Sequence, residues 1–530
     1  MRWRFGLSLL AFGAGVALLV SAAFAGPHAE SRRGGTLRLM WGVDPDYVDP
    51  ALATGTRGSW TLLFATCAKL FNTLQDADTG RGRVAREVVR SFAVSNRGRT
   101  YTFELKPTFR FHTGAPVTAQ SFADAFNRNA KLKQASFVSR RGFMEEIVGA
   151  NAVIYGKATT ISGVQVLGRY RLRVRLKRNA GDFVARLTMP SFCPILPGTP
   201  LDLRGMDKPA GSGPYYIAER VTNRRIVLER NPYYRGGRIA NPDRIVWTID
   251  PDRGERLRAT EQDANDFAAL FDVPDAVVRN LADKYGLNRP GGRFIRLPSL
   301  SNYLFAFNDD RPVFRGARQA PLRKAINYAL DRRALAKAHS YLSVRRTDRL
   351  LPAPLSRSRR LYPLGGPDPI TAQRWLARAG HRPQTLTLYT ANFGFAVPTA
   401  DVFAANLKQL GIEVSVKIFD FNTLSTKLKT KGEPWDVAWL PWGAWYADPA
   451  GAILPLLRGT SYEARINAAN RATGAARVKS WADVETDLMR NDPPVAVYAD
   501  VTSLILVSRS FGCFKSLQGY EIDLAAACKK

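Results

Sequence analysis

The chain has 530 residues, of which 45% are hydrophobic and 11% aromatic, and its formal net charge is +32. This composition excludes a disordered chain, and the length suffices for two or more domains with buried cores. The positive charge favours anionic surfaces or ligands. However, basic residues alternate with apolar ones in Arg169–Arg178, which predicts a strand with one packed face and one solvent-exposed basic face. No nucleic-acid-binding signature occurs in the sequence. We therefore expect no nucleic-acid partner.

The N-terminus has the three parts of a secretory signal. Two arginines precede the apolar segment Phe5–Val20, and Ala23–Ala25 is a small-x-small cleavage motif. No cysteine precedes Cys67, so a lipid-modified cysteine at the cleavage point is excluded. We expect residues 1–25 to be a signal peptide and the rest of the chain to be extracytoplasmic. Retention of the segment as a membrane anchor stays open.

The N-terminal half is predicted to be rich in strands. Thr118 has the position of a helix N-cap before apolar residues at helical spacing. Alternating apolar residues and flanking turn residues indicate strands at Gly34–Trp41 and Thr100–Leu105, and a paired set at Tyr216–Ala218 and Arg225–Arg230.

Four cysteines in an exported chain predict disulfide bonds. Cys513 and Cys528 lie close together in the C-terminal tail, and a bridge between them would hold the tail down. Cys67 and Cys193 would then form the second pair. The sequence allows three pairings and does not choose among them.

The second half is predicted to be α/β. Helices are expected to begin at Pro321 and at Asp368. Strand Leu386–Tyr389, helix Ala400–Leu410 and strand Ile412–Phe419 form a strand–helix–strand unit. Such a unit implies parallel strands and a right-handed crossover.

Residues 434–449, reading PWDVAWLPWGAWYADP, hold four of the ten tryptophans. The apolar run at 436–440 is predicted to be the next strand, and it breaks at Pro441. Large rigid aromatic side chains beside a carboxylate, at the end of a buried strand, are typical of a ligand pocket in an α/β sheet, although tryptophans also pack cores. The predicted pocket residues of this segment are Trp439, Trp442, Trp445, Tyr446 and Asp448.

No catalytic or metal-binding motif occurs in the sequence. The patterns G-x-S-x-G, G-x-x-x-x-G-K-[ST] and H-E-x-x-H are all missing. The four histidines, at positions 28, 112, 339 and 381, have no spacing suited to joint metal ligation. We therefore expect neither enzymatic activity nor a metal or other cofactor.

Six stretches of the chain resemble, in the same order, segments of the extracytoplasmic solute-binding proteins of ABC importers, in the peptide/nickel-binding class (family 5). The export signal agrees with this resemblance. The stretches are GGTLRL at 34–39, TYTFELKPTFRFHTGAPVTAQSFADAF at 100–126, GSGPY at 211–215 with VLERNPYY at 227–234, PLRKAINYALDRRAL at 321–335, ADVFAANLKQLGIEV at 400–414 and the aromatic stretch at 434–449.

The resemblance implies an α/β, two-lobed fold of the periplasmic-binding-protein type (type II, large class), in which two strands cross between the lobes as a hinge. Such a protein is a monomer that closes around a small-molecule or peptide ligand and delivers it to the membrane subunits of an ABC transporter. By the same resemblance, lobe I comprises residues 34–297 and 496–530, with an inserted subdomain at about 55–205, and lobe II comprises residues 298–495.

One departure from the family concerns the ligand. Peptide-binding members have an aspartate in a W-x-x-D-Y segment that pairs with the free amino group of the peptide, whereas Trp445 occupies the matching position here. An indole cannot form that ion pair, so a non-zwitterionic ligand is favoured, unless an acid elsewhere binds the amine. Further ligand contacts that the resemblance suggests are Tyr47, Thr54, Tyr215, Asn302 and Tyr303.

Two other functions stay open from the sequence alone. A protein of the same fold can serve as a sensor or adhesion module that hands its ligand to a partner other than a transporter. A secreted hydrolase is the third reading, and the sequence contains no motif that supports it.

Overall fold

The computed structural model describes residues 33–55, 58–75, 82–270, 273–339, 342–457, 460, 462–517 and 521–530. The predicted signal peptide, residues 1–25, lies outside the described residues. A helix long and apolar enough to span a membrane is absent from the described ranges.

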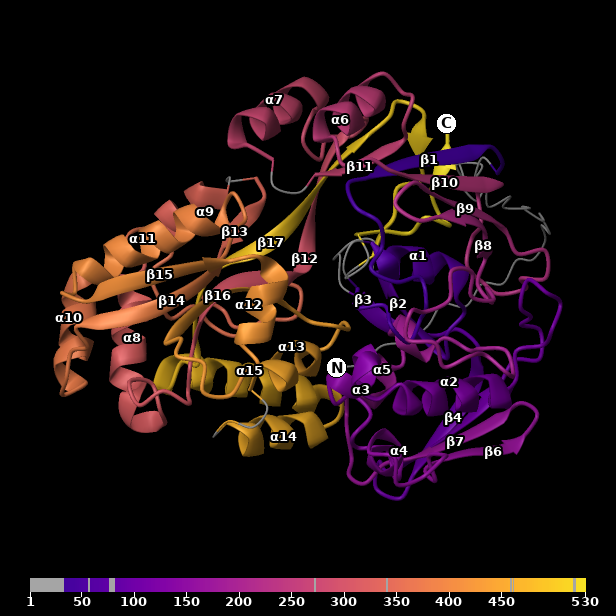
Figure 1. Cartoon of the computed structure of the whole chain (residues 1–530), viewed down its shortest axis with the longest axis horizontal. Helices are drawn as coiled ribbons and strands as arrows, with labels where there is room; N and C mark the ends of the chain where they lie inside the picture. Colours follow the sequence, from indigo (N-terminus) through magenta and orange to yellow (C-terminus); the bar gives the residue numbers. More distant parts are fainter. Residues whose placement is uncertain are drawn as a thin grey trace, which may run out of the picture.

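One 11-stranded sheet runs through both halves of the molecule (Figure 1). Its strand order is β15-β14-β16-β12-β17-β11-β1-β10-β9-β8, with β13 paired to β17. The strands are β1 (Thr36–Trp41), β8 (Tyr215–Val221), β9 (Arg225–Arg230), β10 (Arg244–Ile249), β11 (Phe267–Leu270), β12 (Phe294–Phe307), β13 (Val344–Arg346), β14 (Thr385–Ala391), β15 (Glu413–Phe419), β16 (Val437–Gly443) and β17 (Val495–Val507).

The strand pairings predicted from local patterns are confirmed. β8 and β9 pair antiparallel. β14 and β15 pair in parallel on either side of the helix α11 (Ala396–Lys408), and β16 lies parallel to β14. Helix α11 begins at Ala396 rather than at the predicted Ala400, because Pro398 fits its first turn, where an amide has no partner within the helix.

Two long strands, β12 and β17, pass from one half of the sheet to the other. Phe294–Pro298 of β12 pairs with Thr502–Leu506 of β17, and Asn302–Ala306 of β12 pairs with Val495–Asp500. The register shifts between these two parts. In Figure 1 the two strands connect two groups of elements. We call the elements up to α7 together with the C-terminal tail the first lobe, and those from α8 to α15 the second lobe.

The first lobe has two main cores. One lies under β1 and β8–β11 and contains Leu37, Trp247 and Phe267. The other surrounds a separate sheet of order β4-β5-β7-β6, where Leu172 and Val174 are fully buried as the predicted alternation requires. The other elements of this lobe are β2 (Phe71–Gln75), β3 (Gly82–Arg86), β4 (Val89–Ser95), β5 (Thr100–Leu105), β6 (Val164–Gly168), β7 (Arg171–Arg175), α1 (Ser59–Thr66), α2 (Ala119–Lys131), α3 (Phe137–Arg140), α4 (Ala150–Ile154), α5 (Phe183–Arg186), α6 (Arg253–Glu261) and α7 (Asp275–Tyr285).

In the second lobe, alternate residues of β12 face two different cores. Tyr303, Phe305 and Phe307 pack under α8–α12, whereas Leu304 and Ala306 pack under α13–α15. Successive side chains of a strand point to opposite faces, so this sheet is buried on both sides. The helices are α8 (Ala320–Ala329), α9 (Arg332–His339), α10 (Pro369–Arg378), α11, α12 (Phe421–Lys427), α13 (Pro449–Leu457), α14 (Glu463–Arg471) and α15 (Gly474–Asn491).

The structure contains two disulfide bonds. Cys67 bonds to Cys193, with Cα atoms 5.9 Å apart, and Cys513 bonds to Cys528, with Cα atoms 5.3 Å apart. The second bond holds the C-terminal tail, in which β18 (Phe511–Gly512) pairs with β21 (Cys528–Lys529) against the core of the first lobe. The residue bounds predicted for the lobes stay a prediction.

Candidate functional site

The aromatic segment lies where β16 ends beside the crossing strand β12. Ser301 and Asn302 of β12 pair with Gly443 and Trp442 of β16. A Cβ on residue 443 would lie 2.3 Å from the Ser301 Oγ, so this close approach requires glycine. Residues 444–448 then connect β16 to α13. The segment therefore lies at the point where the chain passes between the lobes.

The two tryptophans on β16 itself pack into the second lobe. Trp439 is fully buried, and its Nε1 donates to the Tyr498 hydroxyl at 2.8 Å. Trp442 is half-buried against the core under α13–α15, and its Nε1 donates to the Ala452 carbonyl at 2.9 Å. Since Trp439 has no exposed surface, the structure places it in the core and not on a ligand-binding surface.

Trp445, beyond the end of the strand, packs against the first lobe. Its ring lies 6.2 Å from the ring of Trp60 and 4.9 Å from that of Phe137, both in edge-to-face geometry. The guanidinium of Arg141 lies 4.9 Å from its ring centre. Trp445 is half-buried, and its Nε1 is a buried donor with no hydrogen-bond partner among the described residues. Trp445 therefore joins the two lobes through edge-to-face ring contacts and a cation–π contact.

Tyr446 joins the lobes through a hydrogen bond. Its hydroxyl donates to Asp182 Oδ2 at 2.5 Å, and its ring packs on Phe143. Burial, and next the Asp182 carboxylate, raise the pKa of Tyr446 well above its ordinary value, so the hydroxyl stays protonated and donates. Burial opposes the ionisation of Asp182, but Arg186, 2.7 Å away, holds the pKa of Asp182 below its ordinary value. The bond therefore has a charged acceptor.

Asn470 of α14 and Arg477 of α15 make further contacts in the same region, Asn470 to Asp182 and Arg477 to Asp448. Asn470 Nδ2 donates to Asp182 Oδ1 at 2.8 Å, and the Gly181 amide donates to the Asn470 carbonyl at 2.8 Å. A Cβ on residue 181 would lie 2.7 Å from that carbonyl, so the lobes approach this closely only at a glycine. Asp448 pairs with Arg477 at 2.5 Å, and burial raises the pKa of Asp448 to about 6.

Three of the other predicted contacts are buried within a single lobe. Tyr215 is fully buried in the first lobe and donates to the Pro242 carbonyl at 2.6 Å. Asn302 is fully buried and donates to the Leu350 carbonyl at 2.9 Å. Tyr303 stacks in the aromatic core of the second lobe. The structure therefore gives these three side chains packing roles, because their polar atoms or rings are enclosed by their own lobe.

Thr54 and Tyr47 lie in the loop after β1. The Thr54 hydroxyl donates to Asp46 at 2.6 Å, which braces the loop. Tyr47 is half-buried and packs against the same first-lobe core that Trp445 contacts. Of the two, Tyr47 has the environment expected for a side chain near the lobe boundary.

The first-lobe half of this arrangement was not predicted from the sequence. Trp60, Phe137, Arg141 and Asp182, together with Asn470 of the second lobe, were not among the predicted contacts. The Arg140-Arg141 doublet is visible in the sequence. Nothing in the sequence, however, connects that doublet with Trp445, which lies some three hundred residues later.

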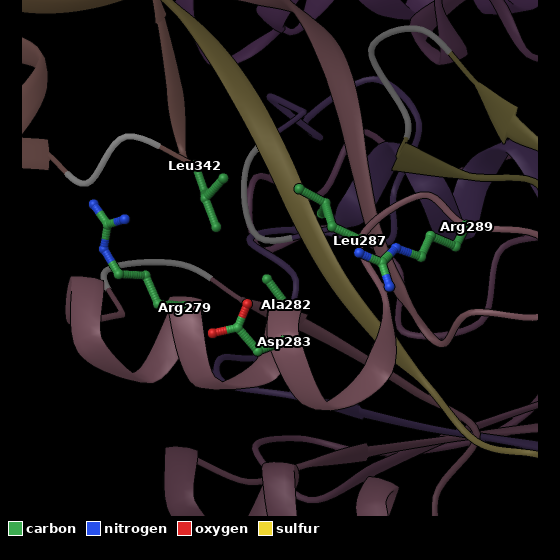
Figure 2. Close-up of a pocket in the computed structure, with 6 residues that line it drawn as sticks. All are labelled: Arg279, Ala282, Asp283, Leu287, Arg289 and Leu342. Atoms are coloured by element: carbon green, nitrogen blue, oxygen red, sulfur yellow. The ribbon is translucent and has the colours of Figure 1, made fainter.

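Two cavities lie elsewhere in the molecule. One, of about 310 Å³, is lined by residues of α7, the turn after it and Leu342 (Figure 2). The other, of about 330 Å³, lies in the first lobe against the Cys67–Cys193 disulfide and His112. Neither is lined by residues of the aromatic segment. Among the described residues, no group of three or more His, Cys, Asp or Glu side chains is placed to hold a metal ion.

The family model described as "Bacterial extracellular solute-binding proteins, family 5 Middle" matches residues 83–464. The periplasmic murein peptide-binding protein MppA of Escherichia coli (strain K12) is 26% identical over 298 residues, which are 56% of this chain and 52% of MppA. The probable D,D-dipeptide-binding periplasmic protein DdpA of the same organism is 24% identical over 443 residues, 82% of this chain and 79% of DdpA. The match to MppA thus spans about half of that relative.

Solved structures share the fold. The clavulanic acid biosynthesis oligopeptide binding protein 2 superposes with a TM-score of 0.81 at 22% identity, over 94% of this chain and 96% of that chain. At this level of identity the likeness concerns the fold, which is a two-lobed α/β fold as predicted.

Proposed function

Because the chain belongs to the bacterial extracellular solute-binding proteins of family 5, we propose that it captures a small solute outside the cytoplasm and delivers it to the membrane subunits of an ABC importer. Capture occurs by closure of two lobes, residues 34–297 with 496–530 and residues 298–495, around the solute. The protein acts as a monomer and makes or breaks no covalent bond. Residues 1–25 direct its export.

The observation that carries this proposal is the set of contacts made by Trp445 and Tyr446. Trp445 packs edge-to-face on Trp60 and Phe137, and Tyr446 donates to Asp182. These contacts join two separately packed lobes beside the crossing strands β12 and β17. Rotation about the two strands would form or break them together, as closure of a binding protein requires.

The proposed ligand has no free amino group that needs a carboxylate partner. Asp448 is paired with Arg477 at 2.5 Å, and Asp182 is paired with Arg186 at 2.7 Å. The carboxylates of Asp448 and Asp182 are therefore engaged within the protein. MppA and DdpA are named for peptide ligands. A peptide-like ligand of this chain would need a blocked or distant amine.

Native mass spectrometry of the purified protein tests this proposal. We expect a small molecule bound at one copy per chain, recovered unchanged after release. A ligand that is converted to product during incubation would contradict the binding role and favour an enzyme. Protein that never carries a solute, even when it is isolated from the medium in which its cells grow, would contradict capture itself.

A further inference from the structure

Three basic side chains gather at the lobe boundary beside Trp445. Arg140 ends α3 of the first lobe and Arg141 follows it, whereas Lys429 lies just after α12 of the second lobe. The Arg141 guanidinium lies 4.9 Å from the centre of the Trp445 ring. Both arginines act electrostatically on Lys429, so the three charges share one region. The cluster is assembled by bringing the two lobes together.

This positive charge is not balanced by the protein. Among the residues that the structure describes, no carboxylate forms an ion pair with Arg140, Arg141 or Lys429, and Lys429 Nζ donates to the neutral Ser425 hydroxyl at 2.8 Å. Burial, and next repulsion from Arg140, lower the pKa of Arg141 to about 10. Burial, and next the two arginines, lower the pKa of Lys429. Closure therefore concentrates charge that an anion would neutralise.

Two N–H donors at the same place have no acceptor. Trp445 Nε1 and Arg141 Nε are buried and have no hydrogen-bond partner among the described residues. By contrast, Trp439 and Trp442 of the same segment donate to Tyr498 and Ala452. Buried N–H groups in proteins are nearly always paired. The indole donors of Trp247 and Trp481 are also unpaired within the described part of the chain, but those of Trp445 and Arg141 lie together at the lobe boundary beside unbalanced positive charge, where one acceptor from outside the chain would serve both.

We infer that the ligand carries an anionic group, a carboxylate, which accepts hydrogen bonds from Arg141 Nε and Trp445 Nε1 and is held electrostatically by Arg140 and Lys429. The inference rests on the proposed capture function and narrows its ligand to a small organic anion. The apolar part of such a ligand contacts the half-buried ring of Trp445. Because the cations come from both lobes, binding of the anion stabilises the closed arrangement.

The test uses three probes of similar shape and different charge: phenylacetate, its neutral amide phenylacetamide, and the cation 2-phenylethylammonium. Isothermal titration calorimetry of the purified protein is expected to give phenylacetate binding that is about tenfold tighter, or more, than binding of either other probe. Arg141→Gln and Lys429→Gln should each weaken phenylacetate binding about tenfold. Trp445→Phe, which keeps an aromatic ring and removes the donor, should weaken it about fivefold. Arg289→Gln, at the separate cavity of Figure 2, is the matched control and should have no effect.

Equal affinity for phenylacetate and phenylacetamide would overturn the inference. So would unchanged phenylacetate binding in the Arg141→Gln protein, or no phenylacetate binding by the wild type. The capture function survives each of these results if native mass spectrometry still finds a neutral or cationic solute on the wild-type protein. If the protein carries no solute of any charge, the capture function fails together with the inference.

Discussion

The hydrogen bond from Tyr446 to Asp182 joins the two lobes, so its removal should weaken ligand binding. Tyr446→Phe deletes a donor 2.5 Å from Asp182 Oδ2 and leaves the ring packed on Phe143. Hydrogen bonds to charged groups contribute about 1.5–3 kcal/mol. This bond forms only when the lobes are together, so its removal makes closure less favourable by the same free energy. The affinity for the ligand should therefore fall about tenfold to a hundredfold.

The assay is isothermal titration calorimetry with the solute that native mass spectrometry identifies. Tyr389→Phe is the matched control, because it removes a tyrosine–carboxylate bond to Glu433, 3.0 Å long, that lies wholly within the second lobe. We expect the control to change affinity less than about twofold. Asp182 keeps Arg186 and Asn470 in the variant, so the protein should fold. Wild-type affinity in Tyr446→Phe, or equal losses in both variants, would show that the Tyr446–Asp182 bond does not contribute to closure.

Two further substitutions have expected outcomes. Trp445→Ala should weaken ligand binding about tenfold or more while the melting temperature shows an intact fold, and unchanged affinity would remove Trp445 from the site. Glu485 is buried and accepts from the Leu351 amide and the Ser356 hydroxyl, and burial raises its pKa from 4.5 to about 7. Its protonated form is favoured in the folded state, so its contribution to stability is complete below about pH 4.5 and is lost as the pH rises through about 7. Glu485→Gln does not titrate, so its melting temperature should fall less than that of the wild type between about pH 5 and about pH 8, and parallel pH profiles would contradict this assignment.

Elements with a strong local signal were predictable from the sequence. The alternation in Arg169–Arg178 correctly placed Leu172 and Val174 on the buried face of β7. Thr118 caps α2, with its hydroxyl accepting from the Ser121 amide. Asp368 caps α10 in the same way. In each case the information lies within a few neighbouring residues, where spacing and capping chemistry determine the structure.

The contacts between the lobes were not predictable in this way. Tyr446 and Asp182 are 264 residues apart in the chain, and their approach depends on how two lobes pack. Residue type alone does not distinguish core residues from residues at the lobe boundary, because Trp439 and Tyr303 are aromatic like Trp445 and yet lie inside the second lobe. What distinguishes Trp445 is its position past Gly443, where β16 ends and the side chains no longer alternate between the two cores.

Small-angle X-ray scattering measures whether the two lobes close when the solute is captured. The measurement compares protein stripped of ligand with the same protein after ligand is restored at saturation. We predict that the radius of gyration falls when ligand binds and that Tyr446→Phe needs more ligand to reach the compact form. An unchanged radius of gyration with the ligand shown to be bound would contradict capture by closure.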